Sequence, residues 1–193
     1  TEILEGYRHR DGGEVAVLGV DPGKGDRHWR TRLGIVLQSA NDLGDLTVEE
    51  SLNHFAGYYP RPRGIDEVIE AVGLTEKRRT KSFNLSGGQR RRLDVALGII
   101  GSPELLFLDE PTTGFDPEAR REFWELIRGL RGLGTTILLT THYLDEAEVL
   151  ADRVAVISRG RVIACDVPAR LGGRDESLAT VSWREDEELR SER

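Results

Sequence analysis

Short, continuous apolar runs alternate with amphipathic stretches in the second half of the chain. Residues 105–108 (LLFL) and 136–139 (TILL) have the length and composition of strands buried on both faces of a parallel sheet. Between them, Asp116 and Pro117 are residue types that begin a helix. The inner face of this helix is predicted to carry Phe123, Ile127 and Leu130. Strand–helix–strand order predicts an α/β domain whose ligand sites lie at the carboxyl ends of the strands.

The N-terminal part of the chain predicts two further strands. Residues 14–20 (EVAVLGV) are largely apolar, and residues 32–38 (RLGIVLQ) form an apolar run that ends in a polar residue. Residues 1–6 (TEILEG) have the pattern of the last turns of a helix that stops at Gly6. A helix already under way at residue 1 suggests that part of the domain lies upstream.

Residues 39–81 predict an α-helical subdomain inserted between two halves of the sheet. Thr47 and Glu50 have the spacing of a capping box, and Pro60 and Pro62 interrupt the helical pattern that follows. A second, short helix is expected up to Gly73. Its apolar positions are Ile65, Val68, Ile69 and Val72.

The end of the chain predicts a small antiparallel element and a charged tail. Residues 153–157 and 161–164 have the pattern of a hairpin that turns at Arg159-Gly160. In the charge-rich tail, residues 172–193, we expect a strand at residues 178–183 (LATVSW) and unfinished helix at residues 185–193.

Composition narrows the class of protein. Apolar residues make up 38% and charged residues 32%, as in ordinary globular domains, and the net charge of −7 provides no basic footprint for nucleic acid. The run Arg90-Arg91-Arg92 lies in a helical pattern, where a solvated face or packing stems are expected. A single cysteine, Cys165, excludes an intrachain disulfide, and the four histidines lack metal-ligand spacing. No stretch approaches the ~18 apolar residues of a membrane span, so we expect a soluble, cytoplasmic protein.

Three segments carry candidate chemistry. Asp109 and Glu110 follow an apolar strand, where paired carboxylates are common ligands of Mg²⁺ bound to phosphates or are simply solvated acids. Residues 85–89 (LSGGQ) precede a helix, and such a sequence is either an anion-binding helix start or a flexible turn. His142 follows the next strand, where it can donate to a phosphate oxygen or serve as a structural residue.

In their order and spacing these segments resemble the motifs of the ABC ATPase family, and the resemblance runs nearly end to end. LSGGQ matches the family signature, and LLFLDE at residues 105–110 matches the Walker B strand with its glutamate. TGFD at residues 113–116 matches the D-loop, with Phe115 where many relatives have leucine. His142 matches the switch histidine, and Gln38 matches the Q-loop glutamine. The resemblance implies a P-loop NTPase (RecA-like) α/β core with a mainly parallel sheet, an inserted α-helical subdomain and a small antiparallel β element.

The resemblance also implies residue roles, with ATP and Mg²⁺ as cofactors. Asp109 is expected to hold Mg²⁺ through water, and Glu110 to orient and polarise the attacking water. His142 is expected to contact the γ-phosphate, and Gln38 to sense Mg²⁺ and the γ-phosphate. In a head-to-tail dimer, the signature residues bind ATP held by a second subunit, and Asp116 lies at the interface. The signature residues are Ser86, Gly87, Gly88 and Gln89.

The family's phosphate-binding Walker A loop, G-x-x-x-x-G-K-[ST], has no match in this sequence. Residues 19–24 (GVDPGK) have three residues between the glycines instead of four, and Gly25 follows Lys24 in place of Ser or Thr. We interpret this segment as a solvent-exposed turn. In relatives the loop runs directly into a helix like residues 1–6, so we expect an N-terminally truncated domain whose first strands and phosphate loop lie upstream.

Further segments resemble the exporter branch that serves drug and small-molecule efflux. They are residues 2–6 (EILEG), 141–148 (THYLDEAE) and 152–171. The implied partner is a membrane permease contacted near residues 39–81, which places the protein on the cytoplasmic face of the plasma membrane. Two alternatives remain open: a soluble ABC ATPase acting on ribosomes or DNA, and a non-catalytic subunit that offers only its signature face to a complete partner.

Overall fold

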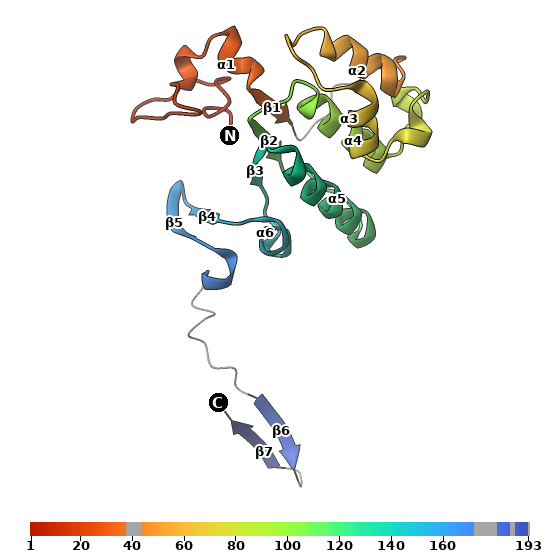
Figure 1. The fold of residues 1–193 in the computed structure, drawn as a ribbon. Coiled ribbons are helices and arrows are strands. Elements are labelled where there is room, and N and C mark those ends of the chain that lie inside the picture. Colours follow the sequence, from red (N-terminus) through yellow and green to blue (C-terminus); the bar gives the residue numbers. More distant parts are fainter. Residues whose placement is uncertain (38–43, 172–180, 186–187, 193) are drawn as a thin grey trace. The chain divides into compact units, whose positions relative to one another are not determined.

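Three parallel strands occupy the centre of the first part of the chain. They are β1 (Leu33–Val36), β2 (Leu105–Asp109) and β3 (Thr136–Thr140), in the order β1-β2-β3 (Figure 1). The computed structural model describes residues 1–37, 44–171, 181–185 and 188–192. It divides the chain into two compact units, Thr1–His142 and Tyr143–Arg193. The apolar runs at residues 33–36, 105–108 and 136–139 are confirmed as strands of a parallel sheet.

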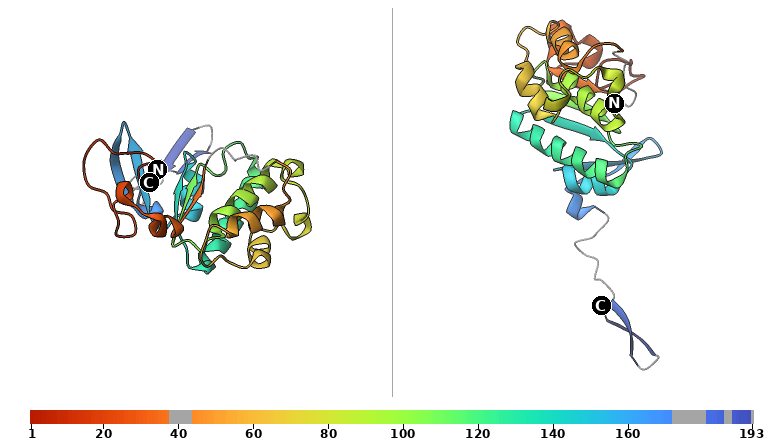
Figure 2. Two further views of the ribbon diagram at one scale, coloured as in Figure 1. Left: turned by 90° about the horizontal axis from the view of Figure 1, so that it is seen from above. Right: turned by 90° about the vertical axis from the view of Figure 1, so that its right-hand side faces the viewer.

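One face of the sheet is covered by helices. Figure 2 shows α4 (Gly87–Ile99) and α5 (Pro117–Leu130) on the same side of the three strands. The helix α4 approaches β1 very closely, because a Cβ atom at Gly34 would lie 2.2 Å from the carbonyl oxygen of Gly98. A Cβ atom at Gly98 would lie 2.8 Å from Cγ2 of Val36. Two glycines therefore set the distance between α4 and the sheet.

The opposite face of the sheet is covered by the N-terminal segment. Trp29 is 2% exposed and packs in one cluster with Val17, Leu33 and Phe107. Its indole Nε1 donates to the carbonyl oxygen of Val17 at 2.9 Å, which satisfies the polar atom of this buried side chain. Trp29 belongs to α1 (Arg27–Thr31), which follows the 3-10 helix η1 (Pro22–Lys24).

Two predictions for the N-terminal segment are wrong. Residues 14–20 do not form a strand: residues 14–16 have no regular structure, and residues 17–20 form a tight turn. In this turn, Leu18 and Gly19 have φ 51° and 78°, and Val17 and Val20 make reciprocal hydrogen bonds of 2.8 and 3.1 Å. Two successive residues at positive φ reverse the chain, so an extended strand cannot continue. Residues 1–6 form hydrogen-bonded turns without an α-helix, although Gly6, at φ 76°, ends them as predicted.

Short helices connect β1 to α4. They are α2 (Val48–Ala56), α3 (Ile65–Ala71), η2 (Thr75–Lys77) and η3 (Ser82–Asn84). The predicted capping box is confirmed, since Thr47 Oγ1 accepts from the Glu50 amide at 3.2 Å and Glu50 Oε2 accepts from the Thr47 amide at 2.9 Å. Residues 39–43 of the predicted subdomain lie outside the described residues. That residues 39–81 act as a separate subdomain stays a prediction.

The helix α5 connects β2 to β3 and begins as predicted. Asp116 caps it, with Oδ1 accepting from the amides of Glu118 and Ala119, both at 2.9 Å. Its predicted inner residues Phe123, Ile127 and Leu130 are buried. The short η4 (Arg131–Leu133) leads into β3. At 14 residues, α5 is the longest helix in the described part of the chain, and no helix there is long and apolar enough to span a membrane.

The second unit contains α6 (Leu144–Leu150), the hairpin β4 (Val154–Ser158) and β5 (Arg161–Asp166), and η5 (Pro168–Arg170). Arg159 and Gly160, at φ 49° and 73°, form the predicted turn. Farther along, β6 (Val181–Glu185) pairs with β7 (Glu188–Glu192). The helix predicted for residues 185–193 is therefore wrong, because residues 188–192 pair with β6, whereas so short an isolated helix is only marginally stable.

Candidate functional site

Two carboxylates and a threonine meet where β2 and β3 end. Asp109 is the last residue of β2, and its Oδ1 accepts a hydrogen bond from Thr140 Oγ1 at 2.5 Å. The amide of Glu110 donates to both the carbonyl oxygen and Oγ1 of Thr140, at 3.1 Å each. Glu110 has φ 41°, a conformation that costs a non-glycine residue on the order of 1–3 kcal/mol. Hydrogen bonds from β3 therefore hold Glu110 in a strained backbone geometry.

The carboxylate of Glu110 gathers two further polar side chains. Its Oε2 accepts from Thr113 Oγ1 at 3.1 Å and lies 3.4 Å from Nδ1 of His142. The side chains of Glu110 and His142 remain 35% and 52% exposed. The structure thus brings together three sequence-predicted residues, Asp109, Glu110 and His142, on a surface that a ligand can reach.

The signature residues form the first turn of α4. Ser86 Oγ accepts from the Gln89 amide at 3.3 Å, and Gln89 Oε1 accepts from the Ser86 amide at 3.1 Å. This reciprocal pair is a capping box. The carboxamide oxygen of Gln89 is therefore used within its own helix, and nucleotide binding by Gln89 stays a prediction. Gly87 and Gly88 occupy the first turn, where backbone amides lack intrahelical acceptors.

Within the described residues, nothing accounts for glycine at positions 87 and 88. A Cβ atom at either residue would meet none of their heavy atoms within 4 Å, and neither glycine has positive φ. Gly34 and Gly98, by contrast, are required by close packing. The open space above Gly87 and Gly88 suits a ligand or partner that approaches the backbone closely.

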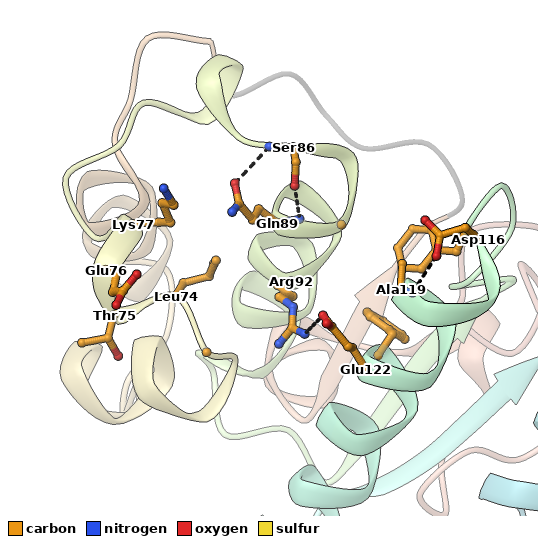
Figure 3. A pocket seen from close by; sticks show the side chains of 14 residues that line it. Leu74, Thr75, Glu76, Lys77, Ser86, Gln89, Arg92, Asp116, Ala119 and Glu122 are labelled. Atoms are coloured by element: carbon orange, nitrogen blue, oxygen red, sulfur yellow. Dashed lines mark hydrogen bonds and ion pairs between the residues drawn. The ribbon is translucent and has the colours of Figure 1, made fainter.

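Two adjoining hollows connect the signature residues with the loop after β2. One, of about 570 Å³, lies between the start of α4 and the loop, and its wall includes Gly87, Gly88, Glu110 and Asp116. The other, of about 620 Å³, has Ser86 and Gln89 on one side and Asp116 on the other (Figure 3). Its third side is formed by Thr75, Glu76 and Lys77. Asp116 thus faces both hollows while capping α5.

Two other predicted segments have separate outcomes. Gln38 lies outside the described residues. In residues 19–24, Lys24 is exposed at the end of η1, as the interpretation as a surface turn requires, whereas Pro22 is buried. Asp21 is bound by Arg10 through two hydrogen bonds of 2.8 and 2.9 Å, and this contact lowers the pKa of the Asp21 carboxyl. The segment is held by the N-terminal loop, and its Asp21 carboxylate is already paired.

Arg91 was missed as a site residue, and the expectation of a solvated face or packing stem is wrong for it. Its side chain is 8% exposed, and its guanidinium donates to three carbonyl oxygens. The acceptors are Leu37, through a short contact, Asp109 at 3.1 Å and Pro111 at 3.1 Å. These acceptors lie 54, 18 and 20 residues from Arg91 in the sequence, so no local pattern could predict the contacts. The position of Arg91 just after LSGGQ was the one available indication.

Asp94 supplies a neighbouring negative charge. Arg91 Nη1 lies 3.8 Å from Asp94 Oδ2, whose side chain is 15% exposed. Burial raises the pKa of the Asp94 carboxyl to about 6, although Arg91 and Arg90 act in the opposite direction. Burial also lowers the pKa of Arg91. A guanidinium remains charged in proteins, so the buried cation relies on these oxygen partners.

Comparison with known proteins places these features in context. A family model described as ABC transporter matches residues 1–113. The chain is 46% identical over 159 residues to the daunorubicin/doxorubicin resistance ATP-binding protein DrrA of Streptomyces peucetius. The aligned region covers 80% of this chain and 48% of that protein. It is also 41% identical over 175 residues to the Nod factor export ATP-binding protein I of Burkholderia pseudomallei (strain K96243). This second aligned region covers 88% of this chain and 58% of that protein.

A solved structure shows the same fold. CbiO1 from Clostridium perfringens, described as part of the ABC transporter complex CbiONQ, matches with a TM-score of 0.78 at 26% identity. The match covers 91% of this chain and 74% of that chain. It confirms the α/β fold class predicted from the sequence. The chain spans about half the length of the curated relatives it matches, 48% and 58% for the two proteins named above.

Proposed function

This chain belongs to the ABC transporter family, and from that membership we propose that it forms part of an ATP-binding subunit that hydrolyses ATP to drive transport. The observation that carries the proposal is the cluster of Asp109, Glu110, Thr140 and His142 where β2 and β3 end. ATP hydrolysis needs little covalent participation by the protein. It needs a positioned water and neutralised phosphate charge, which such a cluster can provide.

The donor set at this edge fits Mg²⁺. Asp109 offers a carboxylate, a ligand type that Mg²⁺ prefers. Among the described residues, no group of three or more His, Cys, Asp or Glu side chains is arranged to hold a metal by itself. This suits an ion that keeps several waters and completes its shell with substrate phosphates. When bound, Mg²⁺ neutralises charge on the phosphate oxygens.

We assign the remaining roles to residues around it. Glu110 orients the attacking water and accepts its proton at the carboxylate, which His142 and Thr113 hold in place. His142 also provides a donor for the γ-phosphate. Gln38, as the family resemblance implies, senses the metal and the γ-phosphate.

A second subunit completes the site in this proposal. Gly87 and Gly88 provide two first-turn amides and have no side chain to keep a ligand away, and Ser86 is the N-cap residue immediately before them. These donors suit the γ-phosphate of ATP held by the partner in a head-to-tail dimer. Asp116, which faces the adjoining hollows, then lies at the dimer interface. Gln89 contributes by capping α4 and thereby fixing this turn.

The transported substrate and the permease are inferred from the relatives. The matched proteins are called daunorubicin resistance and Nod factor export ATP-binding proteins. We therefore assign the chain to export of a drug or other small molecule through a separate permease. The permease holds it at the cytoplasmic face of the plasma membrane.

The proposal is tested on the protein purified from its natural host together with its bound partners. Mg-ATP binding is measured by titration calorimetry and turnover by phosphate release. The variant Glu110→Gln should bind Mg-ATP like the unaltered protein but lose on the order of 100-fold in kcat. Glu125→Gln, which removes an exposed charge on α5, is the matched control. Absence of Mg-ATP binding, or recovery with ribosomes in place of a membrane protein, would overturn the proposal.

A further inference from the structure

Arg91 binds the backbone on both sides of Glu110. Its Nη2 donates to the carbonyl oxygen of Asp109, and its Nε donates to that of Pro111, both at 3.1 Å. The residue between these carbonyls is the strained Glu110, at φ 41°. From β3, Thr140 accepts hydrogen bonds from the amide of Glu110 through its carbonyl oxygen and its Oγ1. The peptide units around Glu110 are thus held from β3 and from α4 at once.

The same guanidinium also binds the end of β1. Its Nη1 donates to the carbonyl oxygen of Leu37, the residue immediately before Gln38. A planar guanidinium presents its donors in a fixed fork, so three acceptors on one fork have set relative positions. Arg91 therefore joins the ends of β1 and β2 to the helix that carries Ser86, Gly87 and Gly88.

The neighbouring arginines make different connections, which isolates the function of Arg91. Arg90 donates to the carbonyl oxygens of Ser82 and Phe83. Arg92 donates to that of Val72 and pairs with Glu122 at 3.2 Å. In the part of the chain that the structure describes, Arg91 is the one of the three whose guanidinium donates hydrogen bonds to the segment that contains Glu110.

We propose that Arg91 is a positioning residue that couples the signature turn of α4 to the placement of Glu110. The proposal rests on the proposed ATPase function. A change at the signature turn, such as docking against a partner's ATP, is transmitted along the first turns of α4 to the guanidinium. From there it reaches the carbonyl oxygens of Asp109 and Pro111. Glu110 and Leu37 then move as one unit with α4.

The first test requires no activity. Amide hydrogen exchange is followed in the unaltered chain, in Arg91→Gln and in Arg92→Gln. Loss of the fork should speed exchange severalfold at Glu110 and Thr113, whose amides bond to Thr140 and to Glu110. Arg92→Gln should instead speed exchange near Val72. Unchanged exchange at Glu110 and Thr113 in Arg91→Gln overturns the coupling, whatever the ATPase result.

The second test separates positioning from simple structural support. In the natural assembly, Arg91→Gln should lower kcat on the order of 10- to 100-fold, with KM for ATP nearly unchanged. Arg91→Lys should recover part of kcat, because an ammonium can still donate to the same carbonyl oxygens. Arg128→Gln, which removes a surface charge on α5, is the control.

The outcomes distinguish the two proposals. Faster exchange with unchanged kcat in an active assembly overturns the positioning role and leaves Arg91 as structural support. A parallel rise in KM and fall in kcat, with no rescue by lysine, also overturns it. An unaltered assembly without ATP turnover overturns the proposed function itself, and with it the positioning role.

Discussion

Nδ1 of His142 lies 3.4 Å from Oε2 of Glu110, joining the residues that follow two neighbouring parallel strands. Both residues lie beyond the carboxyl ends of their strands, where ligand sites of open α/β sheets are found. Because Thr113 donates to the same carboxylate oxygen, Glu110 is held from its own loop and from the neighbouring strand. We interpret the pair as one catalytic unit.

Replacement of His142 should show that the two residues act together. We expect His142→Ala to lower kcat by about 100-fold, on the scale of the loss of one transition-state donor. In a Glu110→Gln background the same replacement should cost little more, because residues that act as a unit have non-additive effects. Phosphate-release kinetics of the four proteins in a double-mutant cycle provide the measurement. If the two replacements lowered kcat by independent factors that multiply in the double variant, the pairing would be contradicted.

Gly88 should be important for turnover and unimportant for folding. The replacement Gly88→Ala places a methyl group where no heavy atom lies within 4 Å, in the first turn of a helix. Stability should stay the same or rise by up to about 1 kcal/mol, as expected for glycine-to-alanine changes in helices. The kcat should fall more than tenfold, because in the proposed dimer the methyl group lies where the partner's nucleotide approaches. Gly129→Ala in α5, also in open space, is the control for helix stabilisation without loss of turnover.

Asp116 should separate its capping role from its proposed interface role. Asp116→Ala removes the acceptor of two amide hydrogen bonds and should destabilise the chain by about 1 kcal/mol. Asp116→Asn keeps a capping acceptor and should leave the free energy of unfolding nearly unchanged. If Asp116→Asn is as active as the unaltered protein, the cap alone explains this residue and the interface role is wrong.

Asp94 should make the stability depend on pH between about 4 and 6. Its folded-state pKa, about 6, lies above the usual pKa of an aspartate, 3.8, so the folded state binds more protons in this window. Stability therefore falls as the pH rises through the window, and the full loss, about 3 kcal/mol for two pKa units, is reached above pH 6. Urea unfolding at pH 4.5 and pH 7.5 measures the effect. In Asp94→Asn this component should disappear; an unchanged pH slope would exclude Asp94 as its source.

Gly34 should be required for the packing of α4 on the sheet. A Cβ atom there would lie 2.2 Å from a backbone oxygen of Gly98, so the helix or the strand must shift. We expect Gly34→Ala to destabilise the chain by about 1–3 kcal/mol or more, the usual cost of overpacking. Thermal unfolding beside Gly129→Ala checks this. Equal stability of the two variants would mean that α4 can move away from β1 without cost.

The strands and helix starts around the site could be predicted because their signals are local. Residues 105–108 and 136–139 are apolar runs, and the Thr47–Glu50 and Asp116-Pro117 patterns satisfy backbone donors within three residues. The placement of Asp109, Glu110 and His142 followed from their positions after two parallel strands. These predictions needed only the period of the strand and the chemistry of the helix cap.

Tertiary structure alone decided the turn at Leu18–Gly19 and the burial of Arg91. The apolar run at residues 14–20 predicted a strand. In the structure the chain instead reverses at Leu18–Gly19, and Val17 packs beside Trp29. Arg91 belongs to a run of three arginines that the sequence pattern does not distinguish. Its charge is buried because three carbonyl oxygens from the ends of two strands converge on one guanidinium. The sequence alone determined the strands and helix starts around the site, whereas the long-range assembly of the strand ends decided which of these arginines is buried between them.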